Sequence, residues 1–275
     1  MPLQPWKKKF IGHLLPLYGE AESRAVAHIA MEELQAKNLS MEAFEALAQQ
    51  WLEQLIKSRP IQYVTGKAHF YKREFFVNEY VLIPRPETEE LAGLAIELLR
   101  VRHEAEIIDV GTGSGCLPIT LAKELPGAKI SAVDISSDAL EVARKNARDL
   151  DAKIVLLQLD FLHDAGGISG KYDLIISNPP YIPAREKELL NVNVTRWEPH
   201  VALFVPDDDH LIFYRHLSAF AARALKPDGY LLVECHQAFS AEIKKLFEQK
   251  ALQAELLFDW SGNARFVKAQ LQAAF

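Results

Sequence analysis

The chain has 275 residues, of which 49% are apolar and 25% are charged, the balance of an ordinary globular protein with room for two domains. This composition excludes a disordered chain and a disulfide-dense scaffold. The formal net charge of −6 argues against a protein that follows the phosphate backbone of nucleic acid, and it favours a protein or small-molecule substrate.

The sequence also bears on the cellular compartment. Its two cysteines, Cys116 and Cys235, lie in apolar runs without metal-ligand spacing, which favours a reducing cytosol. No apolar run approaches the roughly 18 residues that span a bilayer, and the lysines at positions 7–9 are not followed by the apolar core of a signal peptide. We therefore expect a cytoplasmic monomer that does not bind membranes.

Residues 1–60 are predicted to form a small helical domain. Apolar residues recur every three to four positions from Glu20 to Leu34, and a second such stripe follows Ser40, a favourable N-cap. The second helix is expected to stop before Arg59-Pro60, because a residue that precedes proline is pushed out of the helical region. These stripes indicate helices packed on one another, and we predict that this domain docks the substrate.

Residues 61–85 change to aromatic and β-branched residues, which is typical of strands. Two such runs flank Asn78-Glu79, a turn signal. We interpret this region as a β-hairpin that links two domains.

Residues 86–275 alternate apolar strands with amphipathic helices. This pattern predicts an α/β fold, a mainly parallel sheet covered on both faces. The last two strands are separated only by residues 260–263, too few for a parallel crossover, so the final pair must be antiparallel. Five parallel strands that end in such a hairpin are the arrangement of a Rossmann-like methyltransferase domain. The expected strands are Ile107–Val110, Ile130–Asp134, Ile154–Leu159, Leu174–Ser177, Tyr230–Glu234, Leu256–Asp259 and Phe266–Gln270.

A glycine-rich turn follows the first strand of this domain. Glycine permits positive φ and close approach of the backbone to a ligand, and open α/β sheets bind ligands beyond the C-terminal ends of their strands. Acidic residues end the next two strands, where one carboxylate can accept from ribose hydroxyls and the other can contact adenine beside an aromatic ring. The residues predicted to bind this nucleoside cofactor are Gly111, Thr112, Gly113, Ser114, Gly115, Asp134, Asp160 and Phe161, together with Asn178 at the end of the fourth strand. The third glycine comes one residue early for a dinucleotide fingerprint, which favours S-adenosylmethionine.

The fourth strand runs into Asn178-Pro179-Pro180-Tyr181. The two prolines fix φ and remove two backbone donors. The carbonyl of Pro179 and the side-chain oxygen of Asn178 then offer two converging acceptors, which suit an N–H₂ group. An amide nitrogen is a poor nucleophile, so holding both of its hydrogens and aiming the nitrogen would carry the catalysis without a strong base. We expect Tyr181 to pack on the flat face of the target amide.

These motifs resemble a known family. Asn178 to Tyr181 is similar to the motif shared by N6-adenine DNA methyltransferases and N5-glutamine protein methyltransferases. Further segments resemble the bacterial release factor glutamine methyltransferases: residues 59–66, 82–89, 111–115, 196–199 with 202–203, and 259–265. The resemblance implies methylation of the glutamine in the Gly-Gly-Gln motif of peptide chain release factors, with S-adenosylmethionine on the glycine loop, Asp134 and Phe161, and with the glutamine amide on residues 178–181.

Other polar residues leave two interpretations open. Arg85 and its neighbours either line the mouth of the site and bind substrate or form a rigid linker into a helix whose first turn is acidic. Glu198 either binds substrate or is a solvated carboxylate. We expect Asp109 to order the glycine loop through backbone N–H groups. The histidines and the acidic run at 207–209 lack metal-ligand spacing, so we predict no metal site.

Three alternatives to release factor methylation stay open from the residues. Adenine also presents a planar N–H₂ group, so N6-adenine methylation fits the tetrapeptide, although the acidic net charge argues against direct nucleic-acid binding. A ribosomal protein could supply the glutamine instead. A cofactor-binding sensor without activity would not need the intact tetrapeptide.

Overall fold

The computed structural model of the chain describes residues 3–271. The N-terminal part is helical, with α1 (Leu3–Ala36), α2 (Met41–Ile56) and α3 (Ile61–Thr65). α1 bends at Gly19, whose φ of 73° is not helical. The predicted N-cap is confirmed, because the Ser40 hydroxyl accepts the backbone N–H of Ala43 at 3.3 Å. The helices bury a core of their own, made largely of Phe10, Leu14, Phe44, Trp51 and Leu55.

The predicted hairpin exists, but its turn lies elsewhere. The antiparallel strands are β1 (Lys67–Phe70) and β2 (Arg73–Phe76), so Tyr71 and Lys72 form the turn, with φ values of 46° and 66°. The turn predicted at Asn78-Glu79 was wrong as a hairpin turn, and residues 77–85 form no strand. The Asn78 side chain instead accepts the backbone N–H of Tyr80 at 3.1 Å, a local turn that carries the chain toward α4.

The remaining chain forms the predicted seven-stranded sheet, in the order β10-β11-β9-β6-β3-β4-β5. Five strands are parallel, and β11 pairs antiparallel with both β9 and β10, as the short final link required. The prediction of a mainly parallel sheet that ends in an antiparallel hairpin is confirmed. Its strands are β3 (Glu106–Val110), β4 (Lys129–Asp134), β5 (Val155–Gln158), β6 (Tyr172–Ser177), β9 (Leu225–Glu234), β10 (Leu252–Phe258) and β11 (Ala264–Leu271).

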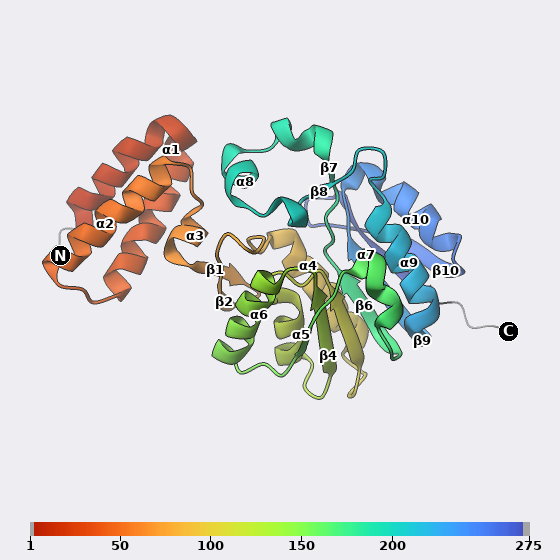
Figure 1. The fold of residues 1–275 in the computed structure, drawn as a ribbon. Coiled ribbons are helices and arrows are strands. Elements are labelled where there is room, and N and C mark those ends of the chain that lie inside the picture. Colours follow the sequence, from red (N-terminus) through yellow and green to blue (C-terminus); the bar gives the residue numbers. More distant parts are fainter. Residues whose placement is uncertain (1–2, 272–275) are drawn as a thin grey trace.

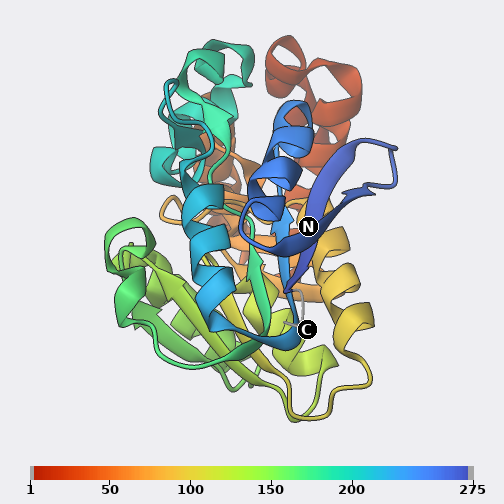
Figure 2. The ribbon, with the colours of Figure 1, turned by 90° about the vertical axis from the view of Figure 1, so that its right-hand side faces the viewer.

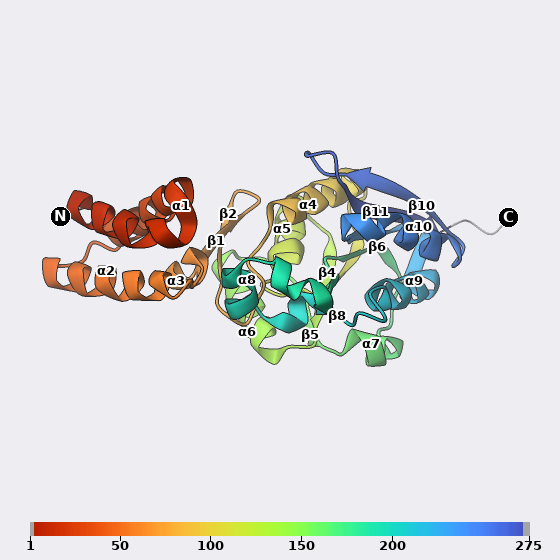
Figure 3. The same ribbon diagram turned by 90° about the horizontal axis from the view of Figure 1, so that it is seen from above.

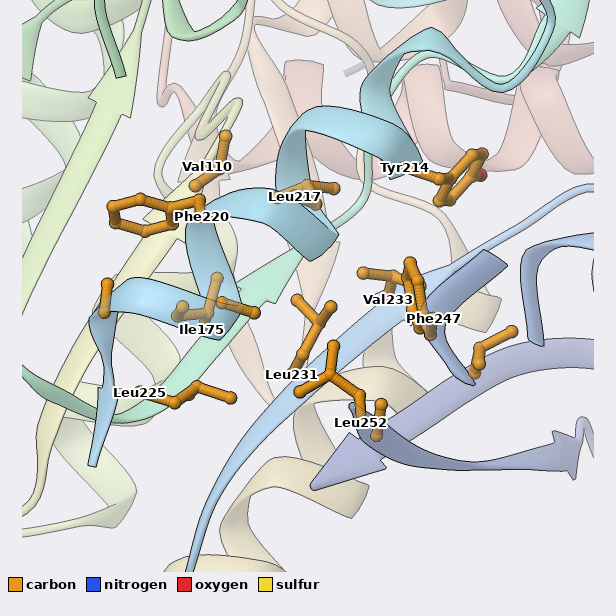
Figure 4. Packing of buried hydrophobic residues seen from close by; sticks show 14 of the residues in the cluster. Val110, Ile175, Tyr214, Leu217, Phe220, Leu225, Leu231, Val233, Phe247 and Leu252 are labelled. Atoms are coloured by element: carbon orange, nitrogen blue, oxygen red, sulfur yellow. The ribbon is translucent and has the colours of Figure 1, made fainter. Parts of the chain in front are cut away.

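Helices cover both faces of this sheet, and Figure 2 shows α9 in cyan and α4 in yellow on opposite sides of the strands. The helices are α4 (Pro86–Leu99), α5 (Cys116–Glu124), α6 (Ser137–Asp149), α7 (Phe161–Asp164), α9 (Ile212–Ala224) and α10 (Ser240–Glu248). Successive strand residues point to opposite faces, so Leu174 and Ile176 pack with α4 and α5 while Ile175 packs with α9. Figure 4 shows Tyr214, Leu217 and Phe220 of α9 above this second face.

One connection does not follow the alternation of strands and helices. Residues 182–205, here called the bridge segment, lie between β6 and α9 and contain β7 (Ile182–Pro183), α8 (Val192–Trp197) and β8 (Phe204–Val205). β7 and β8 pair in parallel and close the base of the segment. Figure 1 shows α8 above the sheet, toward the N-terminal helices. The Trp197 indole N–H donates to the carbonyl of Lys57 at 3.2 Å, so the bridge segment contacts the helical part directly.

Seen from above in Figure 3, α1 and α2 lie to one side, and β1 and β2 stand between them and the sheet. None of the helices in residues 3–271 combines the length and the apolar character needed to cross a membrane.

Candidate active site

A cavity of about 210 Å³ opens at the C-terminal ends of β3, β4 and β6, the edge at which parallel sheets bind ligands. Most of the predicted site residues meet there. The bridge segment and residues 80–82 supply the opposite wall. Of the residues predicted from sequence, the cavity is lined by Gly111, Gly113, Asp134, Asp160, Phe161, Asn178, Pro179 and Pro180. Thr112, Ser114, Gly115, Tyr181 and Arg85 lie outside this lining.

The glycine loop leaves its backbone open to the cavity. Gly111 and Gly113 have φ values of 77° and 53°, and a side chain built on either would meet no atom within 4 Å on that side. Gly115 differs, since a Cβ there would lie 3.0 Å from Ile119 and 3.1 Å from Ala143. The first two glycines therefore provide room for a ligand, whereas the third permits α5 to pack closely against α6.

Asp134 places a carboxylate beside this loop. Its two oxygens accept the backbone N–H groups of Gly113 at 2.8 Å and Ser136 at 2.9 Å. Burial raises the pKa of Asp134 above its ordinary value, although these hydrogen bonds oppose the shift. Each oxygen keeps a lone pair for a further donor, which suits the two hydroxyls of a ribose.

Asp160 and Phe161 lie at the third strand end, as predicted. The Asp160 carboxylate accepts from the backbone N–H of Leu162 at 3.0 Å and contacts His163 Nδ1 at 2.8 Å. The bond to His163 holds the pKa of Asp160 below its ordinary value. Phe161 is buried and meets Phe220 edge-on at 5.5 Å, so its ring is fixed where it faces the cavity. These residues fit the adenosine half of S-adenosylmethionine: an open backbone loop, a carboxylate and a fixed ring.

Asp109 does not act as predicted. Within the described part of the chain, neither of its carboxylate oxygens has a hydrogen-bond partner, although the side chain is fully buried. The glycine loop is held instead by Asp134, through the Gly113 N–H. Burial raises the pKa of Asp109 from 3.8 to about 7, although the neighbouring Thr112 hydroxyl opposes the shift. The prediction that Asp109 orders the loop was wrong, because the loop N–H groups turn toward the neighbouring strand.

Asn178 belongs to a hydrogen-bonded chain that the sequence did not reveal. Its side-chain nitrogen donates to the Thr88 hydroxyl at 2.9 Å, and that hydroxyl donates to Glu234 Oε2 at 2.7 Å. The Tyr181 hydroxyl donates to the other oxygen of Glu234 at 3.1 Å. Burial raises the pKa of Glu234 to about 7, and the two hydroxyl donors restrain the shift. Among residues 3–271 nothing donates to the Asn178 side-chain oxygen or to the Pro179 carbonyl, so both acceptors are available to a ligand.

Tyr181 is held by residues at the end of β9. Its ring meets His236 edge-on at 6.3 Å, and its hydroxyl is bound to Glu234. Burial raises the pKa of this hydroxyl, so it stays protonated and acts as a donor. Its packing on a target amide stays a prediction.

Arg85 and Glu198 form a second polar centre. The Arg85 guanidinium lies 2.6 Å from Glu198 Oε1, and the Ile83 backbone N–H donates to Oε2 at 3.1 Å. Glu198 is only 4% exposed, so the interpretation as a solvated carboxylate was wrong. Both side chains line a second cavity of about 260 Å³ between the helical part and the bridge segment. Pro86 at the start of α4, with Glu87 and Glu89 in its first turn, confirms the predicted helix start.

Comparisons with known proteins show similarity to methyltransferases. Residues 90–195 match a family model described as the methyltransferase small domain. A release factor glutamine methyltransferase of Bacteroides thetaiotaomicron is 42% identical over 230 residues, which cover 82% of each chain. One of Flavobacterium psychrophilum is 36% identical over 288 residues, covering 99% of this chain and 100% of the relative. The crystal structure of a methyltransferase from Pyrococcus furiosus, 16% identical, matches with a TM-score of 0.51 over 73% of this chain and 89% of its own, which supports the fold.

The buried carboxyl of Asp109 predicts a pH-dependent stability. The folded chain keeps a proton there between its ordinary pKa of 3.8 and about 7, whereas the unfolded chain has lost it. Its contribution to stability is therefore present at low pH and is lost as the pH rises through about 7. Asp109→Asn should raise the free energy of unfolding, relative to wild type, more at about pH 8 than at about pH 5, as measured by urea denaturation.

Asp138 provides the control, because it is an exposed aspartate in the first turn of α6. Asp138→Asn should show the same difference from wild type at both pH values. An equal effect of Asp109→Asn at the two pH values would contradict the raised pKa.

Proposed function

The chain belongs to the release factor glutamine methyltransferase family, and we propose that it methylates the side-chain amide nitrogen of the glutamine in the Gly-Gly-Gln motif of peptide chain release factors. One observation carries this proposal. Asn178 and Pro179, next to each other at the end of β6, line the cavity beside the glycine loop, and within residues 3–271 neither the Asn178 side-chain oxygen nor the Pro179 carbonyl accepts a hydrogen bond. Two acceptors at one point fit the two hydrogens of a primary amide.

The chain's own residues would position the amide and would not deprotonate it first. S-adenosylmethionine, when bound, supplies an electrophilic methyl group, whose transfer to nitrogen leaves a neutral thioether and releases one N–H proton to water. Asn178 and Pro179 would hold the nitrogen in line with that methyl group, an effect of orientation and fixed dipoles. Gly111 and Gly113 would admit the cofactor, Asp134 its ribose, and Asp160 with Phe161 its adenine.

The two relatives from Bacteroides thetaiotaomicron and Flavobacterium psychrophilum help to choose among the alternative substrates. Both are release factor glutamine methyltransferases by name, which favours a release factor over a ribosomal protein or adenine. The net charge of −6 supports a protein substrate and no direct nucleic-acid binding. The two buried free thiols, Cys116 and Cys235, support a reducing cytoplasm as its location. We expect the enzyme to act as a monomer.

Substrate selection would use the helical domain of residues 1–60. A Gly-Gly-Gln tripeptide offers too little surface to identify one protein, so a second contact is required. The second cavity lies between α1 and the bridge segment, and its wall combines apolar Ile29 with the charged Glu22, Arg59 and Arg85. Residues 61–85, including β1 and β2, would link this docking domain to the methyltransferase domain of residues 86–275.

The central test replaces the amide acceptor. Asn178→Ala should lower the rate of release factor methylation at saturating substrate by at least about 100-fold, the scale of losing one oriented polar partner. The affinity for S-adenosylmethionine, measured by calorimetry, should change far less, which separates a lost acceptor from a misfolded site. A release factor whose Gly-Gly-Gln glutamine is changed to alanine should accept no methyl group from the wild-type enzyme. Near-normal turnover by the purified variant would rule out the acceptor pair.

The ribose site has its own test. Asp134→Ala should weaken S-adenosylmethionine binding by at least about tenfold, because two charge-assisted hydrogen bonds would be lost. Asp138→Ala, which removes an exposed carboxylate nearby, should bind as wild type does. Calorimetry that returned the wild-type affinity for Asp134→Ala would move the ribose elsewhere.

If the helical domain docks the substrate, a substitution on its surface should weaken substrate binding without impairing methyl transfer. Ile29→Arg places a charge on the α1 wall of the second cavity, so it should lower kcat/KM for intact release factor by at least about tenfold, mainly through KM. A short Gly-Gly-Gln peptide should be methylated equally slowly by both enzymes. Val101→Arg changes a more exposed apolar residue beyond the end of α4, away from the second cavity, and should have no effect. Wild-type kinetics of Ile29→Arg with intact release factor would exclude docking at this wall.

A further inference from the structure

The Asn178 amide can function as an acceptor only if it is turned the right way. A side-chain amide carries an acceptor at one end and a two-hydrogen donor at the other, and the two ends have nearly the same shape. In one orientation the oxygen faces the cavity and accepts from a substrate N–H₂ group. In the other, an N–H₂ group would face an N–H₂ group, and no hydrogen bond could form. Something in the protein must distinguish these two orientations.

The contacts behind Asn178 make that distinction. Glu234, at the end of β9, is 1% exposed, and in its ionised form its carboxylate offers acceptors but no donor. The Thr88 hydroxyl, 3% exposed at the start of α4, has a single hydrogen, which is directed to Glu234 Oε2 at 2.7 Å. Toward Asn178 the Thr88 oxygen can therefore only accept. The Asn178 nitrogen fills this role at 2.9 Å, so the amide oxygen is the end of the side chain that is not bound to Thr88, and Asn178 itself lines the cavity.

We propose that Thr88, held by Glu234, is a positioning residue that fixes the orientation of the Asn178 amide so that its oxygen faces the substrate. The inference rests on the proposed function of Asn178. The direction of each bond follows from the one before it: the ionised carboxylate orients the hydroxyl, and the hydroxyl orients the amide. Glu234 holds Tyr181 in the same way at its second oxygen, 3.1 Å away, so one buried carboxylate orders both ends of the tetrapeptide.

The surroundings of these hydrogen bonds suit the positioning role. Thr88 and Glu234 are separated by 146 positions in the sequence, and Asn178 lies 90 positions from Thr88, so three separate elements meet at one hydroxyl. Both groups are withdrawn from water, which could otherwise donate to either side and erase the preference. The charged groups that bear on Glu234 are Arg265, which favours its ionised form, and Glu87, which disfavours it.

The test compares two changes at one residue. Thr88→Val keeps the shape of the side chain but removes the hydroxyl. The Asn178 amide then lacks the acceptor that distinguishes its two orientations. It should lower kcat for release factor methylation by at least about tenfold, while the affinity for S-adenosylmethionine stays within about twofold. Thr88→Ser retains the hydroxyl and should restore kcat to within about threefold of wild type. A merely structural role for Thr88 would not separate kcat from cofactor affinity in this way.

Two further variants keep the result decisive. Thr120→Val makes the same change at a fully buried threonine whose hydroxyl has no partner in the described residues, so it should leave kcat unchanged. Glu234→Gln introduces an N–H₂ donor that can reverse the hydrogen bond to Thr88, and it should lower kcat as Thr88→Val does. If Thr88→Val does not fold, judged by loss of S-adenosylmethionine binding, Glu234→Gln decides.

The outcomes separate this inference from the proposed function. Absence of release factor methylation by the wild-type enzyme would overturn the proposed function itself. Methylation by the wild type together with a wild-type kcat for Thr88→Val, or for Glu234→Gln, would overturn the positioning role alone. A loss of kcat in both variants, with rescue by Thr88→Ser, would establish it.

Discussion

The whole site depends on the alignment of parallel strands in the sheet. Because β9, β6, β3 and β4 run in one direction, their C-terminal ends meet at one edge. Three of these strands then each deliver one polar residue to that edge: Asp134 from β4, Asn178 just after β6, and Glu234 from β9. Hydrogen bonding along the strands is saturated, so polar side chains become useful only where the ladder stops. The Asn178 amide, the Asp134 carboxylate and the buried Glu234 carboxyl are thus brought together without any local motif joining them.

Two carboxyl groups at this edge are both buried, but only one of them has hydrogen-bond donors. Glu234 receives hydroxyl donors from Thr88 and Tyr181, so its burial is compensated by directed hydrogen bonds. Asp109, two strands away in the sheet, makes no hydrogen bond in the described part of the chain, and its pKa reaches about 7 as well. A compensated carboxylate orders its neighbours, whereas an uncompensated one mainly reduces stability. The similar pKa values therefore hide different roles, which only the donor geometry separates.

Sequence alone predicted the sheet well, because a strand buried on both faces is rich in consecutive apolar residues, as β6 is at residues 174–176. It misplaced the hairpin turn, since Tyr71 and Lys72 adopt positive φ without the glycine or asparagine that usually marks such a turn. It found Asn178, whose neighbours form a motif, but it missed Thr88 and Glu234 as its partners. A contact between residues 146 positions apart leaves no local pattern, and Thr88 reads simply as a helix-start residue. Functional residues that are adjacent in the sequence, at the end of one strand, can be predicted from it. Partners that come together only when separate elements fold against one another cannot.

The stretch between β2 and α4 connects the two cavities. Tyr80, Val81 and Leu82 line the first, and Ile83 and Arg85 line the second, so one extended run of backbone forms a wall of both. The bridge segment faces this run across both spaces, and Glu198 ties the two together by accepting from Ile83 and Arg85. A protein substrate that placed its glutamine in the first cavity and a second surface in the second would therefore lie along residues 80–85. The buried Glu198 fixes the separation of the two contacts, and a fixed separation lets a weak local interaction with a short motif combine with a remote one into selective binding.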